Sequence, residues 1–326
     1  MKKKLNDDII EAIKGRLPQE KQIVAFLIEI LHLGRESIYR RIRGDVVFTF
    51  DEVAIISTQL GFSIDSLVGL KESERVLFSA DLHKKLPHED IYYNKLVKYI
   101  THKENKDASS YLTNKIAINY LPYAASLYLS ALTKFRYYKW IHQTQGIEPN
   151  QKMADVVLPK KIEDFQKQWF KVKDNDIIKA TFIIDKRIFL YMCNDINYFY
   201  SRSLLSDDEM HQLRDELLTL IKNWEDAART GVNEGASVQF YLLEFNLNTG
   251  YSHTDYDNNT ISYIHTQNII SLQSTNKHVC EVQKKWIDML KRYSVRISES
   301  GEMQRLEYFN KQRAYIENMG LAYSSV

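Results

Sequence analysis

Glycine is scarce in this sequence, and the spacing of its 11 glycines removes several common functional motifs. None lies between Gly69 and Gly146, or between Gly146 and Gly231. Dinucleotide-binding proteins, P-loop NTPases, kinases and α/β-hydrolases each need glycines where the backbone approaches a phosphate or bends sharply, and their motifs do not occur. No H-E-x-x-H pair occurs either. The usual loops of these enzyme classes are therefore missing.

Cysteine and net charge are also low. Cys193 and Cys280 are too few for a disulfide framework or a cysteine-based zinc site, which fits a reducing cytosol, so we expect a cytoplasmic protein. No apolar segment follows the first lysines, and no secretory signal is expected. Lys+Arg 44 against Asp+Glu 42 leaves a net charge of +2, so any nucleic-acid site must come from local clustering of charge.

One uncharged stretch, residues 116–133, is nearly long enough to span a bilayer. It contains Asn119, Pro122 and three tyrosines, which are unfavourable in hydrocarbon. We therefore predict a buried core segment here and no membrane partner.

The length of 326 residues predicts two folded units. Residues 1–70 read as a run of short helices at 7–17, 19–31, 35–43, 50–60 and 63–67, from apolar residues at helical spacing. Thr49 and Glu52 have the spacing of a capping box, and Gly61 follows the end of that helix. Residues 71–90 are charged and are predicted to be a linker.

Residues 91–326 read as a helix-rich domain. Helices are predicted at 91–103, 132–145, 207–230, 277–293 and 301–319, and strands at 237–247, 251–257 and 260–265. The predicted fold class is α+β and mainly helical: an all-α N-terminal domain, then a helix-rich domain with a small antiparallel sheet.

Residues 35–43 hold four arginines and one glutamate on a short predicted helix. At 100° per residue, Ile38 and Ile42 share the buried side of this helix. Glu36, Arg40 and Arg43 then face outward, and Ser37, Tyr39 and Arg41 lie on the flanks. Arginine can bind guanine O6 and N7 in the major groove, and backbone N–H groups of the first turn favour phosphate. We predict DNA contacts from Arg35, Glu36, Ser37, Tyr39, Arg40, Arg41 and Arg43. The alternative is a solvated face with Glu36 and Arg40 as an i,i+4 pair.

The segment Leu31-His-Leu-Gly-Arg-Glu-Ser-Ile-Tyr-Arg-Arg-Ile-Arg-Gly44, with the helix at 50–60, resembles the helix-turn-helix of bacterial transcription regulators of the Cro/phage-repressor type. The likeness covers residues 7–70 and implies a recognition helix in the major groove. It departs from the family at His32, where a glycine is usual, and at Gly34, where a Ser or Thr cap is usual. Along its whole length the chain also resembles single-chain regulators of Bacteroides-like bacteria, whose large C-terminal domain is uncharacterised, and residues 297–309 are similar to their tail. This second resemblance implies no activity.

Two weaker candidates lie in the second domain. His253, Asp255 and Asp257 alternate along one predicted strand and could ligate a metal, but a solvated hairpin face is the preferred interpretation. A tyrosine-rich set could line an effector pocket, although a helical core is the commoner explanation. The set comprises Tyr111, Tyr120, Tyr123, Tyr128, Tyr137, Tyr138 and Trp140.

The sequence as a whole predicts a sequence-specific regulator of transcription that binds double-stranded DNA and is not an enzyme. The second domain would supply homodimerisation and sensing of a small-molecule effector, and no cofactor is expected. Two alternatives remain: a nucleotide- or metal-dependent enzyme with an attached DNA-binding module, and a protein-interaction adaptor.

Overall fold

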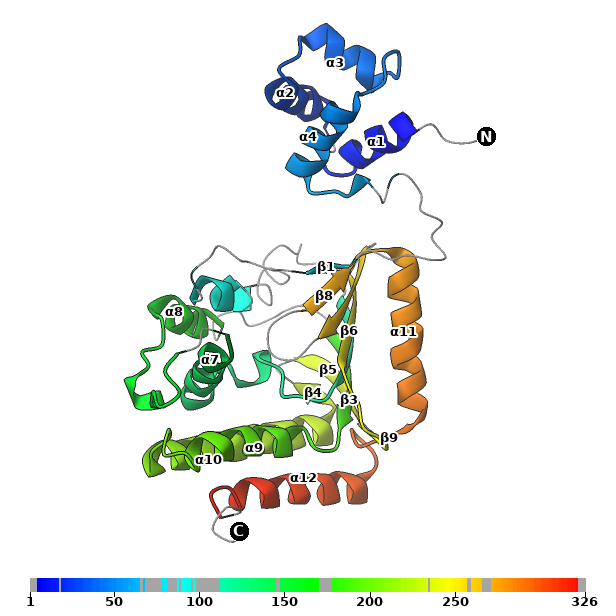
Figure 1. The fold of residues 1–326 in the computed structure, drawn as a ribbon. Helices are drawn as coiled ribbons and strands as arrows, with labels where there is room; N and C mark the ends of the chain where they lie inside the picture. The colour runs from blue at the N-terminus through cyan, green and yellow to red at the C-terminus, as the bar shows by residue number, and fades with distance from the viewer. Residues whose placement is uncertain are drawn as a thin grey trace. The chain divides into compact units, whose positions relative to one another are not determined.

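The chain divides into two units, Met1–Leu77 and Phe78–Val326, each with its own hydrophobic core (Figure 1). The computed structural model describes residues 5–17, 19–64, 67, 78–80, 87, 89–94, 96–97, 112–144, 147–169, 178–233, 235–256, 259–265 and 271–321. Most of the predicted linker 71–90 lies outside these residues. Within it, Ser79–Ala80 form strand β1, and residues 89 and 90 begin a helical segment that continues to residue 94.

The first unit is built from four helices, α1 Leu5–Lys14, α2 Glu20–Leu31, α3 Arg35–Ile42 and α4 Phe50–Leu60. Each turns an apolar side toward one core, in which Leu27, Ile38 and Ile56 are completely buried. The predicted capping box of α4 is confirmed, since Thr49 and Glu52 exchange their hydrogen bonds. The last predicted turn, residues 63–67, lies partly outside the described residues.

The second unit contains a nine-stranded mixed sheet with the order β1-β8-β7-β6-β2-β3-β5-β4, and β9 also pairs with β5. Strands β2, β3 and β5 run parallel to one another at its centre. The strands beyond β1 are β2 Leu112–Ile118, β3 Ile178–Asp185, β4 Val232–Asn233, β5 Ala236–Leu243, β6 Gly250–Tyr256, β7 Asn259–His265, β8 Ser271–Ser274 and β9 Ser294–Arg296.

The predicted fold class is wrong about this sheet, which is large and mixed rather than small and antiparallel. The β6–β7 hairpin was predicted, but β2 and β3 were not. Helices cover both faces of the central strands, and β2 (LTNKIAI) and β3 (IKATFIID) therefore lack the regular alternation of a half-exposed strand that would have marked them. Residues 116–118 belong to β2, and the rest of the uncharged stretch leads into α7 Ser130–Thr144.

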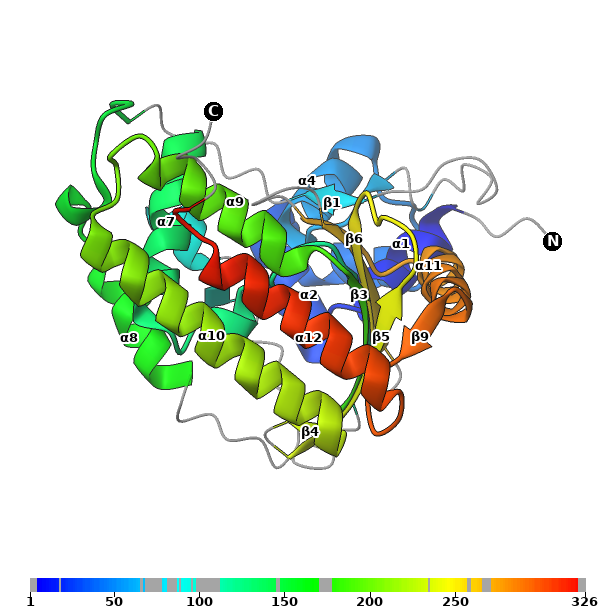
Figure 2. The ribbon, with the colours of Figure 1, turned by 90° about the horizontal axis from the view of Figure 1, so that it is seen from below.

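Helices lie on both faces of the sheet (Figures 1 and 2). On one face, α7, α9 Ile188–Tyr200, α10 Asp207–Thr230 and α12 Glu302–Glu317 pack with the sheet into the main core, which also includes side chains of α8 Lys160–Trp169. On the other face, α11 Lys277–Arg292 packs Ile287 and Leu290 against Ala117, Ile183 and Tyr241. Short 3₁₀ turns form at Ala124–Ser126 and Met153–Asp155. None of the helices in the described ranges is both long and apolar enough to cross a membrane.

Candidate nucleic-acid interface

The turn between α2 and α3 is made by His32, Leu33 and Gly34. His32 adopts the left-handed conformation, with φ 54° and ψ 33°, and its N–H donates to the carbonyl of Ile28 at 3.0 Å. Left-handed geometry is uncommon for a residue other than glycine, although histidine accepts it more readily than most. Gly34 is extended and begins α3 without a side-chain cap. The chain thus makes this tight turn with a histidine, rather than a glycine, in the left-handed conformation.

Helix α3 is held on the bundle by one completely buried side chain. Ile38 is 0% exposed and contacts the core of the first unit, and Ile42 and Tyr39 pack against that core while partly exposed. The predicted inward side of the helix is therefore correct. Glu36, Arg40 and Arg43 lie on the opposite side and are exposed, while Ser37, Tyr39 and Arg41 are half-buried on its flanks.

Arg41 is bound within the unit rather than free. Its Nε and Nη2 donate to the two carboxylate oxygens of Glu52 at 2.9 and 2.8 Å, and its Nη1 donates to the Ser37 carbonyl at 3.3 Å. Both side chains of the ion pair are 14% exposed. Burial opposes ionisation of Glu52, but hydrogen bonds from Arg41 and Thr49 outweigh it and lower the pKa of this carboxyl group. The pair therefore fixes α3 against the start of α4.

The other three arginines of this segment are differently placed. Arg43 pairs with Asp45 at 3.0 Å and with Glu36 at 3.7 Å, both in exposed positions where ion pairs contribute little and a phosphate can compete. Arg35 lies over the ring of Tyr39, at 5.9 Å from its centroid. Arg40 is exposed, and its guanidinium has no hydrogen-bonding or ionic partner among the residues that the structure describes. Arg40 is thus the arginine most open to a ligand.

Replacing Glu52 with glutamine is expected to destabilise the first unit by about 1–2 kcal/mol, because the neutral amide can no longer accept two charged hydrogen bonds from Arg41. Far-UV circular dichroism during urea unfolding measures this change. Glu29 is exposed on α2 and provides the control, since Glu29→Gln should alter stability by less than about 0.5 kcal/mol. Equal effects of the two variants would show that the Arg41–Glu52 pair does not hold α3.

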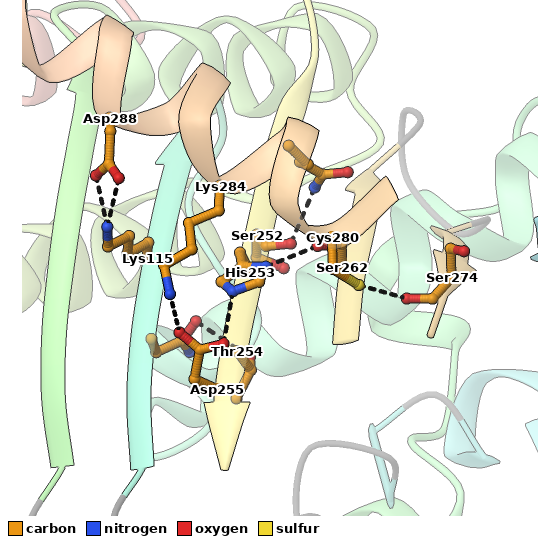
Figure 3. A network of polar contacts seen from close by, with 12 residues as sticks. Lys115, Ser252, His253, Thr254, Asp255, Ser262, Ser274, Cys280, Lys284 and Asp288 are labelled. Atoms are coloured by element: carbon orange, nitrogen blue, oxygen red, sulfur yellow. Dashed lines mark hydrogen bonds and ion pairs between the residues drawn. The ribbon is translucent and has the colours of Figure 1, made fainter. Parts of the chain in front are cut away.

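The metal candidate of the second unit is a closed polar network (Figure 3). His253 Nδ1 lies 2.8 Å from Ser262 Oγ, His253 Nε2 lies 2.9 Å from Asp255, and Asp255 accepts a hydrogen bond from Lys284 at 2.6 Å. Asp257 lies outside the described residues. Within the described parts of the chain, no group of three or more His, Cys, Asp or Glu side chains is placed to hold a metal ion.

The preferred interpretation of this strand, a solvated hairpin face, is wrong, because α11 covers it. His253 is 1% exposed, and this burial lowers its pKa despite the neighbouring carboxylate of Asp255. Burial would raise the pKa of Asp255, but hydrogen bonds from Lys284 and His253 lower it. Hydrogen bonds connect Ser262 to His253 and His253 to Asp255, as in the Ser-His-Asp triad of hydrolases. Ser262 is completely buried, however, so a substrate cannot reach its hydroxyl. The network therefore joins α11 to β6 and β7.

The tyrosine-rich set lies mostly in the main core. Tyr137, Tyr138 and Trp140 are buried there, and Tyr120, Tyr123 and Tyr128 pack against it while partly exposed. Tyr111 lies outside the described residues. The helical-core explanation thus fits the described members of this set better than an effector pocket does.

Comparison of the chain with protein-family models, with curated proteins and with solved structures finds no match. Function must therefore be inferred from the sequence pattern and from the geometry of the two units.

Proposed function

We propose that this protein is a sequence-specific regulator of transcription that binds double-stranded DNA through α3. The observation that carries the proposal is that one side of this short helix is buried and the opposite side exposes an arginine. Ile38 is completely buried on the side that packs on the bundle. Arg40 is exposed on the opposite side, and its guanidinium has no partner among the residues that the structure describes. A short helix with arginines on its outer side matches the width of the major groove and the acceptors of guanine.

The proposal gives the side chains of α3 different tasks. Arg40 reads a base edge, and Arg35 and Arg43 hold phosphates near the two ends of the helix. Glu36, Ser37 and Tyr39 are placed to contribute further groove or backbone contacts, with Glu36 suited to accept from cytosine N4. Arg41 acts as a positioning residue, because Glu52 already occupies its guanidinium.

The second unit supplies homodimerisation in this proposal. One short helix reads only a few base pairs, so two copies on two half-sites are the expected route to useful affinity. The proposal also includes a cytoplasmic location and a small-molecule effector, and both rest on the sequence alone.

Replacing Arg40 with alanine is expected to weaken binding to a selected operator by about 1–3 kcal/mol without changing thermal stability. Arg43→Ala should weaken binding to all sequences alike and reduce the slope of log K against log salt by about 1. Arg16→Ala is the matched control, since it removes the same charge from an exposed position in the turn that follows α1, in the same unit. Fluorescence anisotropy titrations at several salt concentrations measure these effects.

Arg40→Lys separates base reading from charge. Lysine keeps the positive charge but lacks the planar fork, so this variant should retain affinity for random DNA and lose preference for the operator. If Arg40→Ala binds the operator as tightly as Arg16→Ala does, α3 is not the reading element. Absence of any DNA binding at low salt would favour the adaptor function, and turnover of a nucleotide would favour the enzyme.

A further inference from the structure

A small cavity lies between the first half of α11 and the hairpin of β6 and β7. Its volume is about 310 Å³, at the lower end of the range for small-molecule sites. Asp255, Tyr256 and Thr260 line it from the hairpin, and Lys277 and Glu281 line it from α11. Asp255 and Thr260 are directly paired across the two strands, so their side chains share the face that α11 covers. The size of the cavity therefore suits a small ligand.

The buried end of the cavity is electrically neutral. It is formed by His253, Asp255, Cys280 and Lys284, which Figure 3 shows gathered between α11 and β6. Asp255 and Lys284 neutralise each other at 2.6 Å, and burial keeps His253 uncharged at neutral pH by lowering its pKa. This end of the cavity therefore offers a ligand no unpaired charge.

The outer part of the cavity holds one charge of each sign without a partner. Lys277 and Glu281 are both exposed, and neither has a hydrogen-bonding or ionic partner among the residues that the structure describes. They lie one turn apart on α11, so their side chains are neighbours on the surface of the helix. A lysine four residues before a glutamate is the less favourable order for a helical ion pair, and these two side chains do not pair with each other. Both charges are therefore available to a ligand.

These two opposite charges determine which ligands the cavity favours. A simple anion would be repelled by Glu281, and a simple cation would be repelled by Lys277. A zwitterion can place its carboxylate against Lys277 and its ammonium group against Glu281, so both side chains gain a partner of opposite sign. An α-amino acid carries its two charged groups on one carbon atom, which suits two side chains whose Cβ atoms lie about 5–6 Å apart. The hydroxyls of Thr260 and Thr275 and the amide of Asn259 also line the cavity and suit a short polar side chain.

We propose that this cavity binds a free α-amino acid with a short polar side chain, with Lys277 bound to its carboxylate and Glu281 to its ammonium group. The biological role of the site rests on the proposed function, in which the amino acid is the small-molecule effector. Binding of the amino acid is measured without DNA, so the site and the proposed function can fail separately.

Isothermal titration calorimetry of the full-length protein tests this site, with free serine, threonine and asparagine as separate probes. We expect at least one of them to bind. The 2-hydroxy acid that lacks the ammonium group of the bound amino acid, and the amine that lacks its carboxylate, should each bind about tenfold more weakly or worse, because each leaves one of the two charges without a partner. Binding of none of the three amino acids, or equal binding of either analogue, would overturn the proposal.

Two pairs of variants locate the bound amino acid. Lys277→Gln and Glu281→Gln should each weaken its binding about tenfold or more. Lys285→Gln and Glu307→Gln are the matched controls, because they remove the same charges from exposed positions on α11 and α12 outside the cavity. Circular dichroism shows whether the variants remain folded. If Lys277→Gln and Glu281→Gln bind the amino acid as tightly as their controls do, the cavity is not its site.

Discussion

Replacing Ile38 with alanine is expected to lower the free energy of unfolding of the first unit by about 2–5 kcal/mol. Ile38 is 0% exposed and is the completely buried side chain of α3, so its loss removes apolar contacts and leaves a cavity under the helix. A domain of this size has a stability of only about 3–9 kcal/mol. The variant should therefore unfold largely or wholly in its first unit and lose DNA binding as well.

Two spectroscopic signals separate the units in this experiment. All four tryptophans lie beyond residue 77, so tryptophan fluorescence reports on the second unit alone, whereas far-UV circular dichroism reports on both. Ile38→Ala should shift an early part of the dichroism transition and leave the fluorescence transition unchanged. Ile55 is 42% exposed on α4, and Ile55→Ala is the control that should cost less than about 1 kcal/mol. Equal effects of the two variants would mean that α3 is not anchored by Ile38.

Acidification from pH 7 to pH 4 is expected to destabilise the second unit by about 3 kcal/mol through His265 alone. Burial lowers the pKa of this imidazole to about 4. Its described neighbours are the hydroxyls of Ser252 and Ser271, at 2.8 and 3.0 Å, and the rings of Tyr120 and Tyr263, and none of these is negatively charged at neutral pH. The protonated form is therefore poorly accommodated in the folded protein.

The sign of the effect depends on where the proton binds. Between about pH 6.5 and pH 4 the unfolded chain holds the proton on residue 265 and the folded protein does not, so stability falls as pH falls through this range. His265→Gln should flatten the pH dependence of urea unfolding followed by tryptophan fluorescence. His278→Gln, at an exposed position on α11, should leave it as steep as in the wild type. Parallel curves for the wild type and His265→Gln would contradict the assignment.

The parts of the fold that local signals determine were predictable from sequence. Thr49 and Glu52 predicted the start of α4, and Ser206 with Glu209 has the same spacing at the start of α10; both capping boxes form. The bounds 50–60 and 207–230 are correct because Gly61 and Gly231 end these helices in the left-handed conformation. Ser300 has the residue type of an N-cap, but Gly301 occupies that position in α12.

The features that the sequence did not predict depend on packing between distant segments. The parallel strands β2 and β3 are separated by the long stretch between Ile118 and Ile178, and no periodic pattern marks either one. Alternation along β6 correctly placed His253 and Asp255 on one face, but only the fold shows that α11 covers it. The Arg41–Glu52 pair likewise arises where α3 meets α4, so helical periodicity alone could not distinguish Arg41 from Arg40.

Reading of double-stranded DNA by α3 is best tested by selection of genomic fragments with the purified full-length protein, followed by footprinting. We expect enriched fragments with two related half-sites about 34 Å apart, or a multiple of that spacing. Their protection should be lost in Arg40→Ala and retained in Arg16→Ala. Enrichment of no fragment at low salt, or equal protection by the two variants, would show that α3 does not read DNA.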